Sequence, residues 1–196
     1  AQVALQNVPI YSQWIGTLDG MVNAEIRAQV TGYLLGQNYK EGSFVRKGQL
    51  LFEIDQRPFQ AALDQAKGDL ARAQAQQAQA NSQLLQAQAQ LAQSEANQVK
   101  AQLDVDRYAP LAKEKAVTAQ EFDNSVQANI AAKAQVKAAN AGVETAKSAI
   151  VAADAAVEAA RATVKTAELN LSFTKITSPI DGVAGIAQAQ VGNLIQ

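Results

Sequence analysis

The chain has 196 residues with no cysteine and no histidine, and its 17 basic and 18 acidic side chains leave a formal net charge of -1. Because neither sign of charge dominates, the composition offers no general electrostatic attraction to nucleic acid or to an anionic membrane. The lack of cysteine and histidine excludes zinc centres with those ligands, thiolate nucleophiles and histidine-based triads. We expect neither an enzyme nor a cofactor, and any enzyme would have to rely on carboxylates, lysine, serine or threonine alone.

The N-terminus, Ala1-Gln2-Val3-Ala4-Leu5, lacks the basic flank and the long apolar core of a signal peptide. If the protein is exported, its targeting segment has already been removed. Residues 23–57 alternate apolar side chains around glycines, which predicts short β-strands joined by tight turns. The uncharged segment 73–94 is mostly glutamine and alanine, and glutamine is too polar to lie unpaired in hydrocarbon, so we predict no transmembrane helix.

Residues 58–170 carry two heptad patterns that predict two long helices. In the first arm, leucine and alanine recur at complementary heptad positions, with Gln77 as an exception. The leucines are Leu63, Leu70, Leu84 and Leu91, and the alanines are Ala66, Ala73, Ala80, Ala87 and Ala101. The second arm repeats the arrangement with Val136, Val143, Ile150, Val157 and Val164, and with Ala139, Ala146, Ala153, Ala160 and Ala167. We expect a closely packed antiparallel coiled-coil hairpin in which every second core layer is small, with arms of about 75 Å.

The heptads stop between Asp106 and Phe122, and this interval predicts the tip of the hairpin. Pro110 is expected to interrupt the first helix, because proline has no amide hydrogen to donate and its ring clashes with the preceding turn. The segment Thr118-Ala119-Gln120-Glu121 has the pattern of a capping box, in which the first and last residues exchange hydrogen bonds between side chain and backbone. The second helix should therefore begin just after Thr118.

Residues 171–196 repeat the pattern that precedes the hairpin. Gly32 and Gly42 are ten residues apart in the first copy, and Gly182 and Gly192 are ten residues apart in the second. The repetition predicts that the two ends of the chain form one small β-sandwich from which the hairpin projects. We interpret these four glycines and Gly48 as positions that need a positive φ angle or a close approach of the backbone.

Several of these segments together resemble a known protein family. They are Val30-Thr31-Gly32, Tyr39-Lys40-Glu41-Gly42, Val45-Arg46-Lys47-Gly48-Gln49-Leu50-Leu51-Phe52-Glu53-Ile54-Asp55 and Leu171-Ser172-Phe173-Thr174-Lys175-Ile176-Thr177-Ser178-Pro179-Ile180-Asp181-Gly182. They resemble the split lipoyl domain of periplasmic adaptors, or membrane fusion proteins, of Gram-negative tripartite efflux pumps. The resemblance is closest to adaptors of resistance-nodulation-division (RND) transporters.

The resemblance implies an α+β fold with four parts. Residues 1–22 would be a leftover strand of a β-barrel domain, and residues 23–57 the first half of a lipoyl-like β-sandwich. Residues 58–170 would be the helical hairpin, with its tip at about 107–118, and residues 171–196 the second half of the lipoyl-like domain. Tyr11 and Trp14 would then be barrel residues, although an exposed aromatic pair can also form an interface.

The family's hairpin tip carries an arginine, a leucine four residues later and a serine seven residues further on. Arg107, Leu111 and Thr118 stand at that spacing, with threonine in place of serine. The resemblance implies that they dock onto a TolC-type outer-membrane channel. Each residue also has a structural interpretation, since Thr118 can be an N-cap, Leu111 can pack within the tip, and Arg107 can pair with Asp104 or Asp106.

The function implied by the resemblance is that of a non-catalytic adaptor in the periplasm, attached to the inner membrane in the full-length protein. It would link an RND-type inner-membrane transporter to the channel for export of drugs or other small molecules, and would self-associate as a hexamer. One alternative is an adaptor of an ABC or major facilitator exporter, and another is a coiled-coil scaffold without a transport role. A lipoyl carrier is a third alternative, but Gln56 stands where the acceptor lysine would be.

Overall fold

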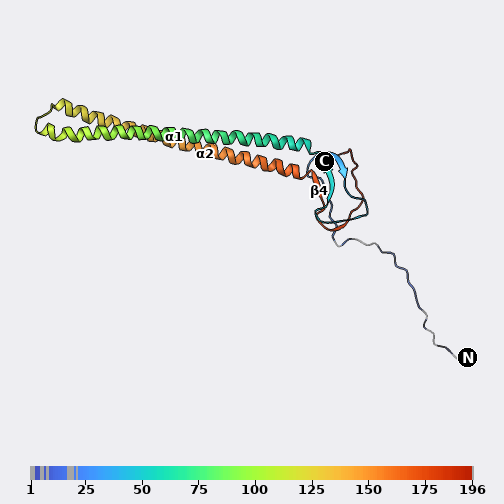
Figure 1. The fold of residues 1–196 in the computed structure, drawn as a ribbon. Coiled ribbons are helices and arrows are strands. Elements are labelled where there is room, and N and C mark those ends of the chain that lie inside the picture. Colours follow the sequence, from blue (N-terminus) through green and yellow to red (C-terminus); the bar gives the residue numbers. More distant parts are fainter. Residues whose placement is uncertain (1–2, 5–6, 8, 17–19, 21, 196) are drawn as a thin grey trace.

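The structure is a computed structural model that describes residues 3–4, 7, 9–16, 20 and 22–195. In this part of the chain, two long helices project from a small β-domain (Figure 1). Strands β1 (Gly32–Gln37), β2 (Phe44–Val45) and β3 (Leu50–Ile54) precede the helices α1 (Arg57–Lys113) and α2 (Ala119–Ser172). Strands β4 (Lys175–Thr177), β5 (Gly182–Val183) and β6 (Leu194–Ile195) follow them.

The β-domain is assembled from both sides of the hairpin. One sheet has the strand order β4-β3-β1-β6 and the other pairs β2 with β5, and all pairs are antiparallel. Each sheet thus combines strands that precede the hairpin with strands that follow it, which confirms the predicted split domain and the α+β fold. The apolar core of the domain consists of Leu34, Val45, Leu51 and Ile54.

The predicted internal repeat is visible in two equivalent turns. The amide of Gly42 donates to the carbonyl of Ala184 at 2.8 Å, and the amide of Gly192 donates to the carbonyl of Leu34 at the same distance. The same offset of 150 residues relates Gly42 to Gly192 and Leu34 to Ala184. The two halves therefore form the same turn and each bonds to the other half, which is the arrangement of a two-fold repeat.

The five glycines singled out in the sequence differ in what they require. Gly42, Gly48 and Gly192 have φ angles of 75°, 81° and 95°, in the left-handed region that favours glycine. Gly32 is a close-approach position, because a Cβ there would lie 2.6 Å from Cγ2 of Ile54. Gly182 meets neither condition, since its φ lies outside that region and no atom beyond its chain neighbours comes within 4 Å of a Cβ built there.

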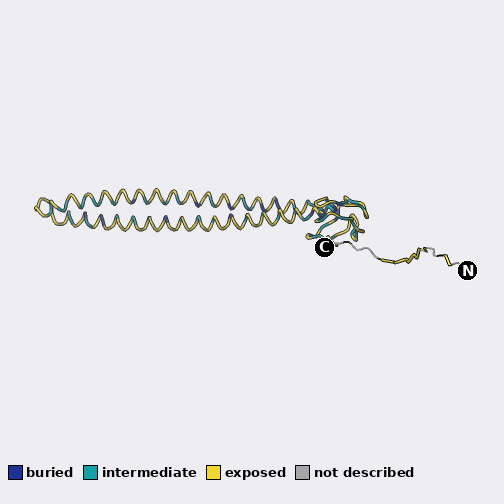
Figure 2. Tube along the Cα trace, turned by 90° about the horizontal axis from the view of Figure 1, so that it is seen from below, coloured by how far each residue is buried: buried dark blue, intermediate teal, exposed yellow. Residues whose placement is uncertain are grey.

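The two helices pack side by side along their length as an antiparallel pair (Figures 1 and 2). The heptad positions named in the sequence analysis form the seam between the two helices. They are buried or half-buried in both helices, while the rest of the hairpin surface is largely exposed. With 57 residues in α1 and 54 in α2, the arms are longer than predicted. At 1.5 Å per residue, the rod extends about 80 to 86 Å.

Two hydrogen bonds between the helices define their register. Nε2 of Gln77 donates to Oδ1 of Asp154 at 2.5 Å, and Nδ2 of Asn129 donates to Oε1 of Gln102 at 2.7 Å. Both bonds correspond to the same antiparallel alignment, so one register holds from the middle of the rod to its outer part.

This register changes the predicted composition of the core layers. Extended by heptads, it places Leu84 in the layer of Ala146 and Val143 in the layer of Ala87. The expectation that every second layer is small is therefore wrong. Large and small residues alternate along each helix, but the antiparallel alignment combines one of each in a layer.

The expected barrel strand at residues 1–22 is not seen in the described residues of that segment. Residues 1–2, 5–6, 8, 17–19 and 21 of this segment lie outside the described part of the chain. Tyr11 and Trp14 are largely exposed, and the indole of Trp14 donates to the hydroxyl of Ser12 at 3.2 Å. Neither helix of the described chain contains a stretch apolar enough to cross a membrane.

Candidate functional site at the hairpin tip

The end of α1 differs from the sequence-based expectation. Pro110 does not interrupt the helix, which continues through it to Lys113. The φ angle that the pyrrolidine ring imposes is itself helical, and this close to the end of α1 the lost amide bond and the crowding against the preceding turn do not end the helix. The carbonyl of Pro110 still accepts the amide of Glu114 at 3.1 Å, within the last turn. The tip is consequently shorter than predicted, with five residues, 114–118, between the helices.

A Schellman motif closes α1. The amide of Ala116 donates to the carbonyl of Leu111 at 2.9 Å, and the amide of Lys115 donates to the carbonyl of Ala112 at 3.1 Å. Lys115 has a φ of 53°, the only positive value at a non-glycine residue in the described part of the chain. Glycine usually occupies this position, and its absence explains why the motif was not recognised in the sequence. Leu111 thus contributes its backbone carbonyl to the turn.

Thr118 is the N-cap of α2, and the predicted capping box is confirmed. Its hydroxyl oxygen accepts the amide of Glu121 at 3.2 Å, while its own amide and hydroxyl donate to Oε2 of Glu121 at 2.9 and 2.8 Å. The bond from the backbone of Thr118, followed by the bond from its side chain, lowers the pKa of the Glu121 carboxyl. The hydroxyl hydrogen is therefore already used within the tip, and the hydroxyl oxygen keeps one further acceptor site.

Arg107 lies on the exposed surface one helical turn before Leu111. Its Nη1 donates to Oδ1 of Asp104 at 3.2 Å, and the Arg107 side chain is 67% exposed. Of the two partners considered from the sequence, the structure selects Asp104. The spacing of four residues places Arg107 and Leu111 on one face of α1, whereas Thr118 lies across the turn.

A shallow groove on the side of the hairpin extends from this surface toward the base. It is lined by Asn97, Lys100, Ala101, Asp104, Tyr108, Glu121, Asn124, Ser125 and Ala128. Asp104, which pairs with Arg107, belongs to it. Sequence reasoning did not identify the groove, because the groove depends on the alignment of two helices.

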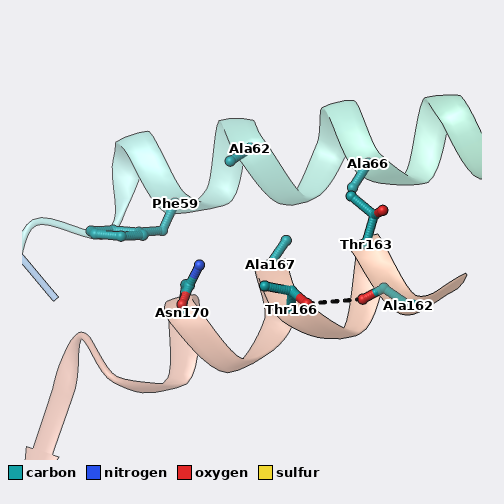
Figure 3. Close-up of a pocket in the computed structure, with 8 residues that line it drawn as sticks. All are labelled: Phe59, Ala62, Ala66, Ala162, Thr163, Thr166, Ala167 and Asn170. Carbon is teal, nitrogen blue, oxygen red and sulfur yellow. Dashed lines mark hydrogen bonds between the residues drawn. The ribbon is translucent and has the colours of Figure 1, made fainter. Parts of the chain in front are cut away.

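A second groove lies at the base of the hairpin, beside Phe59 (Figure 3). Its walls are mainly alanine and threonine side chains. The hydroxyl of Thr166 donates to the carbonyl of Ala162 at 3.0 Å. No charged side chain lines it. In the described residues, acidic side chains nowhere gather in a group that could hold a metal ion. The tip, with Arg107, Leu111 and Thr118, remains the candidate site predicted from the sequence.

Comparison with known proteins identifies the family. The family model described as "RND MFP, barrel-sandwich hybrid domain" matches residues 22–196, and the chain belongs to these membrane fusion proteins. The multidrug efflux pump subunit AcrA of Escherichia coli K12 is 38% identical over 173 residues, which are 88% of this chain and 33% of AcrA. The multidrug resistance protein MdtA of Pantoea ananatis is 32% identical over 195 residues, which are 100% of this chain and 37% of MdtA.

Among solved structures, MacA from Actinobacillus actinomycetemcomitans is 28% identical with a TM-score of 0.46, and the match covers 90% of this chain and 46% of MacA. The chain spans about a third of the length of the curated relatives AcrA and MdtA.

Proposed function

We propose that the protein is a periplasmic adaptor of a tripartite efflux pump, attached to the inner membrane in its full-length form. It links an RND-type inner-membrane transporter to a TolC-type outer-membrane channel, so that drugs or other small molecules leave the cell. Membership of the membrane fusion proteins supports this proposal, as do the names of its relatives, which are a multidrug efflux pump subunit and a multidrug resistance protein.

The observation that carries the proposal is the shape of the molecule. A rod of two helices projects from a compact β-domain and ends in a tip far from that domain (Figure 1). A rod of about 80 Å spans a distance that a compact domain of this size cannot. The length of the rod then determines the distance that the adaptor spans between transporter and channel, and the tip determines where it contacts the channel.

The tip offers the chemistry of a docking surface. The Arg107 guanidinium has five N–H donors, and its bond to Asp104 leaves others for carbonyls at the end of a partner helix. Leu111, one turn away, is half-buried and adds apolar area beside these donors. Together they fit a partner surface of helix ends and small apolar side chains.

Self-association is the second part of the proposal, with six copies as the resemblance implies. The outward face of α1 carries a second heptad stripe, in which every residue is exposed and apolar or small. The stripe consists of Ala71, Ala75, Ala78, Ser82, Leu85, Ala89, Ala92, Ala96, Val99 and Leu103. The residues of the stripe are alternately four and three positions apart, which is the heptad spacing by which two helices pack side by side. A neighbouring copy of the hairpin supplies such a helix.

The experiment compares a tip variant with a matched control on the same helix face. Arg107→Asp and Leu111→Asp are expected to abolish drug resistance in cells that depend on this protein. The first replaces the guanidinium donors by a negative charge, and the second places a negative charge in the apolar part of the docking surface. Arg72 is the control, since it forms the same type of pair with Asp69 and is similarly exposed, but lies five heptads closer to the base. Arg72→Asp should leave resistance intact, and all three variants should keep normal helicity.

Photo-crosslinking in intact envelopes identifies the contacts directly. A crosslinking residue at Arg107 or Leu111 should capture the outer-membrane channel, and one at Leu85 should capture a second copy of this chain. Unchanged resistance in the Arg107→Asp, Leu111→Asp double variant, with no channel captured, would refute the docking role and favour a scaffold without a transport function.

A further inference from the structure

The buried residues of the hairpin change character along the rod. Toward the base they are all apolar, namely Leu63, Ala66, Ala73, Ala80, Val143 and Val157. Toward the tip they are all polar, namely Ser94, Ser125 and Asn129. Gln98 occupies another seam position in the same outer part and is half-buried. From Ser94 outward no apolar seam residue is fully buried, and those that remain, such as Val105, Phe122 and Val136, are half-buried. Hydrophobic stabilisation of the seam is therefore weaker there than toward the base.

Hydrogen bonding between the helices does not replace this loss. The hydroxyls of Ser94 and Ser125 donate to carbonyls of their own helices, at 2.9 Å to Gln90 and 2.7 Å to Phe122. Such bonds satisfy the hydroxyl but add nothing between the helices, and a bond from serine to the preceding turn tends to bend a helix. The outer seam gains little from either serine.

Asn129 forms the one side-chain hydrogen bond that joins the helices in this outer part. It is 7% exposed and its Nδ2 donates to Gln102. Its Oδ1 is buried without a partner, the only such side-chain atom among the described residues. A buried acceptor without a donor recovers its hydrogen bond when the layer opens to water, so this layer favours opening.

The tip beyond these layers is well closed by local bonds. The Schellman motif at Lys115 and the capping box at Thr118 hold the turn together. The polar layers thus lie between an apolar base and a bonded tip.

We propose that residues 94–136 form a separately opening unit, in which the layers of Ser94, Gln98 and Asn129 act as a flexible joint. The tip changes its direction there while the base of the hairpin stays closed. The use of this joint in docking rests on the function proposed above, but the opening itself is a property of the chain alone. It can be tested without any partner.

The test uses single cysteines, because the chain has none of its own. Ser94→Cys probes the outer seam, and Ala73→Cys is the matched control in the inner seam. Ala73 lies about as far from the start of α1 as Ser94 lies from its end. In the structure Ser94 is 2% exposed and Ala73 is 8% exposed. A rigid rod predicts slower modification by a maleimide at position 94. The proposal predicts the opposite order, with position 94 reacting at least about fivefold faster through local opening.

A second substitution ties the effect to the polar layer. Asn129→Val removes the buried amide, whose Oδ1 has no partner, and puts valine there, as at other seam positions of α2. It should slow the reaction of Ser94→Cys while leaving that of Ala73→Cys unchanged. Rates are divided by those of the unfolded chain, so that differences in thiol reactivity cancel. Circular dichroism checks that every variant is folded.

Hydrogen exchange of the unmodified chain provides an independent measurement. Amides in residues 94–136 should exchange faster than those in residues 58–93. Equal exchange in the two segments, slower modification at position 94 than at position 73, or no response to Asn129→Val would each overturn the proposal.

Discussion

A leucine swap across one core layer tests the register of the hairpin. The alignment defined by the bonds of Gln77 and Asn129 places Leu84 and Ala146 in the same layer. Ala146→Leu would put two leucines into space now filled by one, at an expected cost of about 1 to 3 kcal/mol. Leu84→Ala should cost about 2 kcal/mol, the lower end for leucine, because Leu84 is only half-buried.

The double variant should recover most of this loss. It keeps one leucine and one alanine in the layer, with their helices exchanged, so we expect its free energy of unfolding to lie within about 1 kcal/mol of the original. Urea unfolding followed by circular dichroism at 222 nm measures all three variants. Leu84→Ala combined with Ala153→Leu is the control, since Ala153 lies one heptad away in the layer of Gln77. That pair should be additive within about 0.5 kcal/mol. If the Leu84 and Ala146 effects also add, the two residues do not share a layer and the register is wrong.

Other predictions concern the tip and the β-domain. Thr118→Ala should lower the free energy of unfolding by about 0.5 to 2 kcal/mol, because α2 loses its N-cap. Since the capping box lowers the pKa of Glu121, its contribution is present above the unfolded-state pKa and is lost as the pH falls through the folded one. The difference between Thr118→Ala and the original chain, followed by urea unfolding at several pH values, should therefore shrink on acidification, and a growing difference would contradict this sign. Gly32→Ala should cost about 1 to 3 kcal/mol through its clash with Ile54, whereas Gly182→Ala should be neutral or slightly stabilising in the same assay.

The end of α1 shows where local rules were insufficient. Pro110 suggested a break in the helix, but its effect depends on which hydrogen bond is lost, and near the end of a helix the neighbouring bonds still form. The actual stop is a Schellman motif with Lys115 in the left-handed conformation. Lysine carries no signal for that conformation, so this stop was not predictable. The start of α2 was predictable, because Thr118 and Glu121 form their capping box within one turn.

The candidate site was predicted in part. The spacing of Arg107, Leu111 and Thr118 pointed to the tip, and the structure shows the contacts that each makes within the chain: a pair with Asp104, a Schellman turn and an N-cap. The groove beside the tip was missed, because its two walls come from different helices.

The sequence by itself determined the two helices, their seam, the capped turn and the joining of the chain ends. Heptad spacing, capping pairs and a repeated glycine motif can each be recognised from residues that lie close together in the chain, even where the elements that they predict pack against distant segments. The tertiary structure showed which residues of the two helices share a layer and that a side chain at Gly32 would clash with Ile54. It also showed that the amide oxygen of Asn129 lies buried without a donor. These features depend on atoms from segments distant in sequence, and only the packed hairpin and the paired sheets bring those segments together.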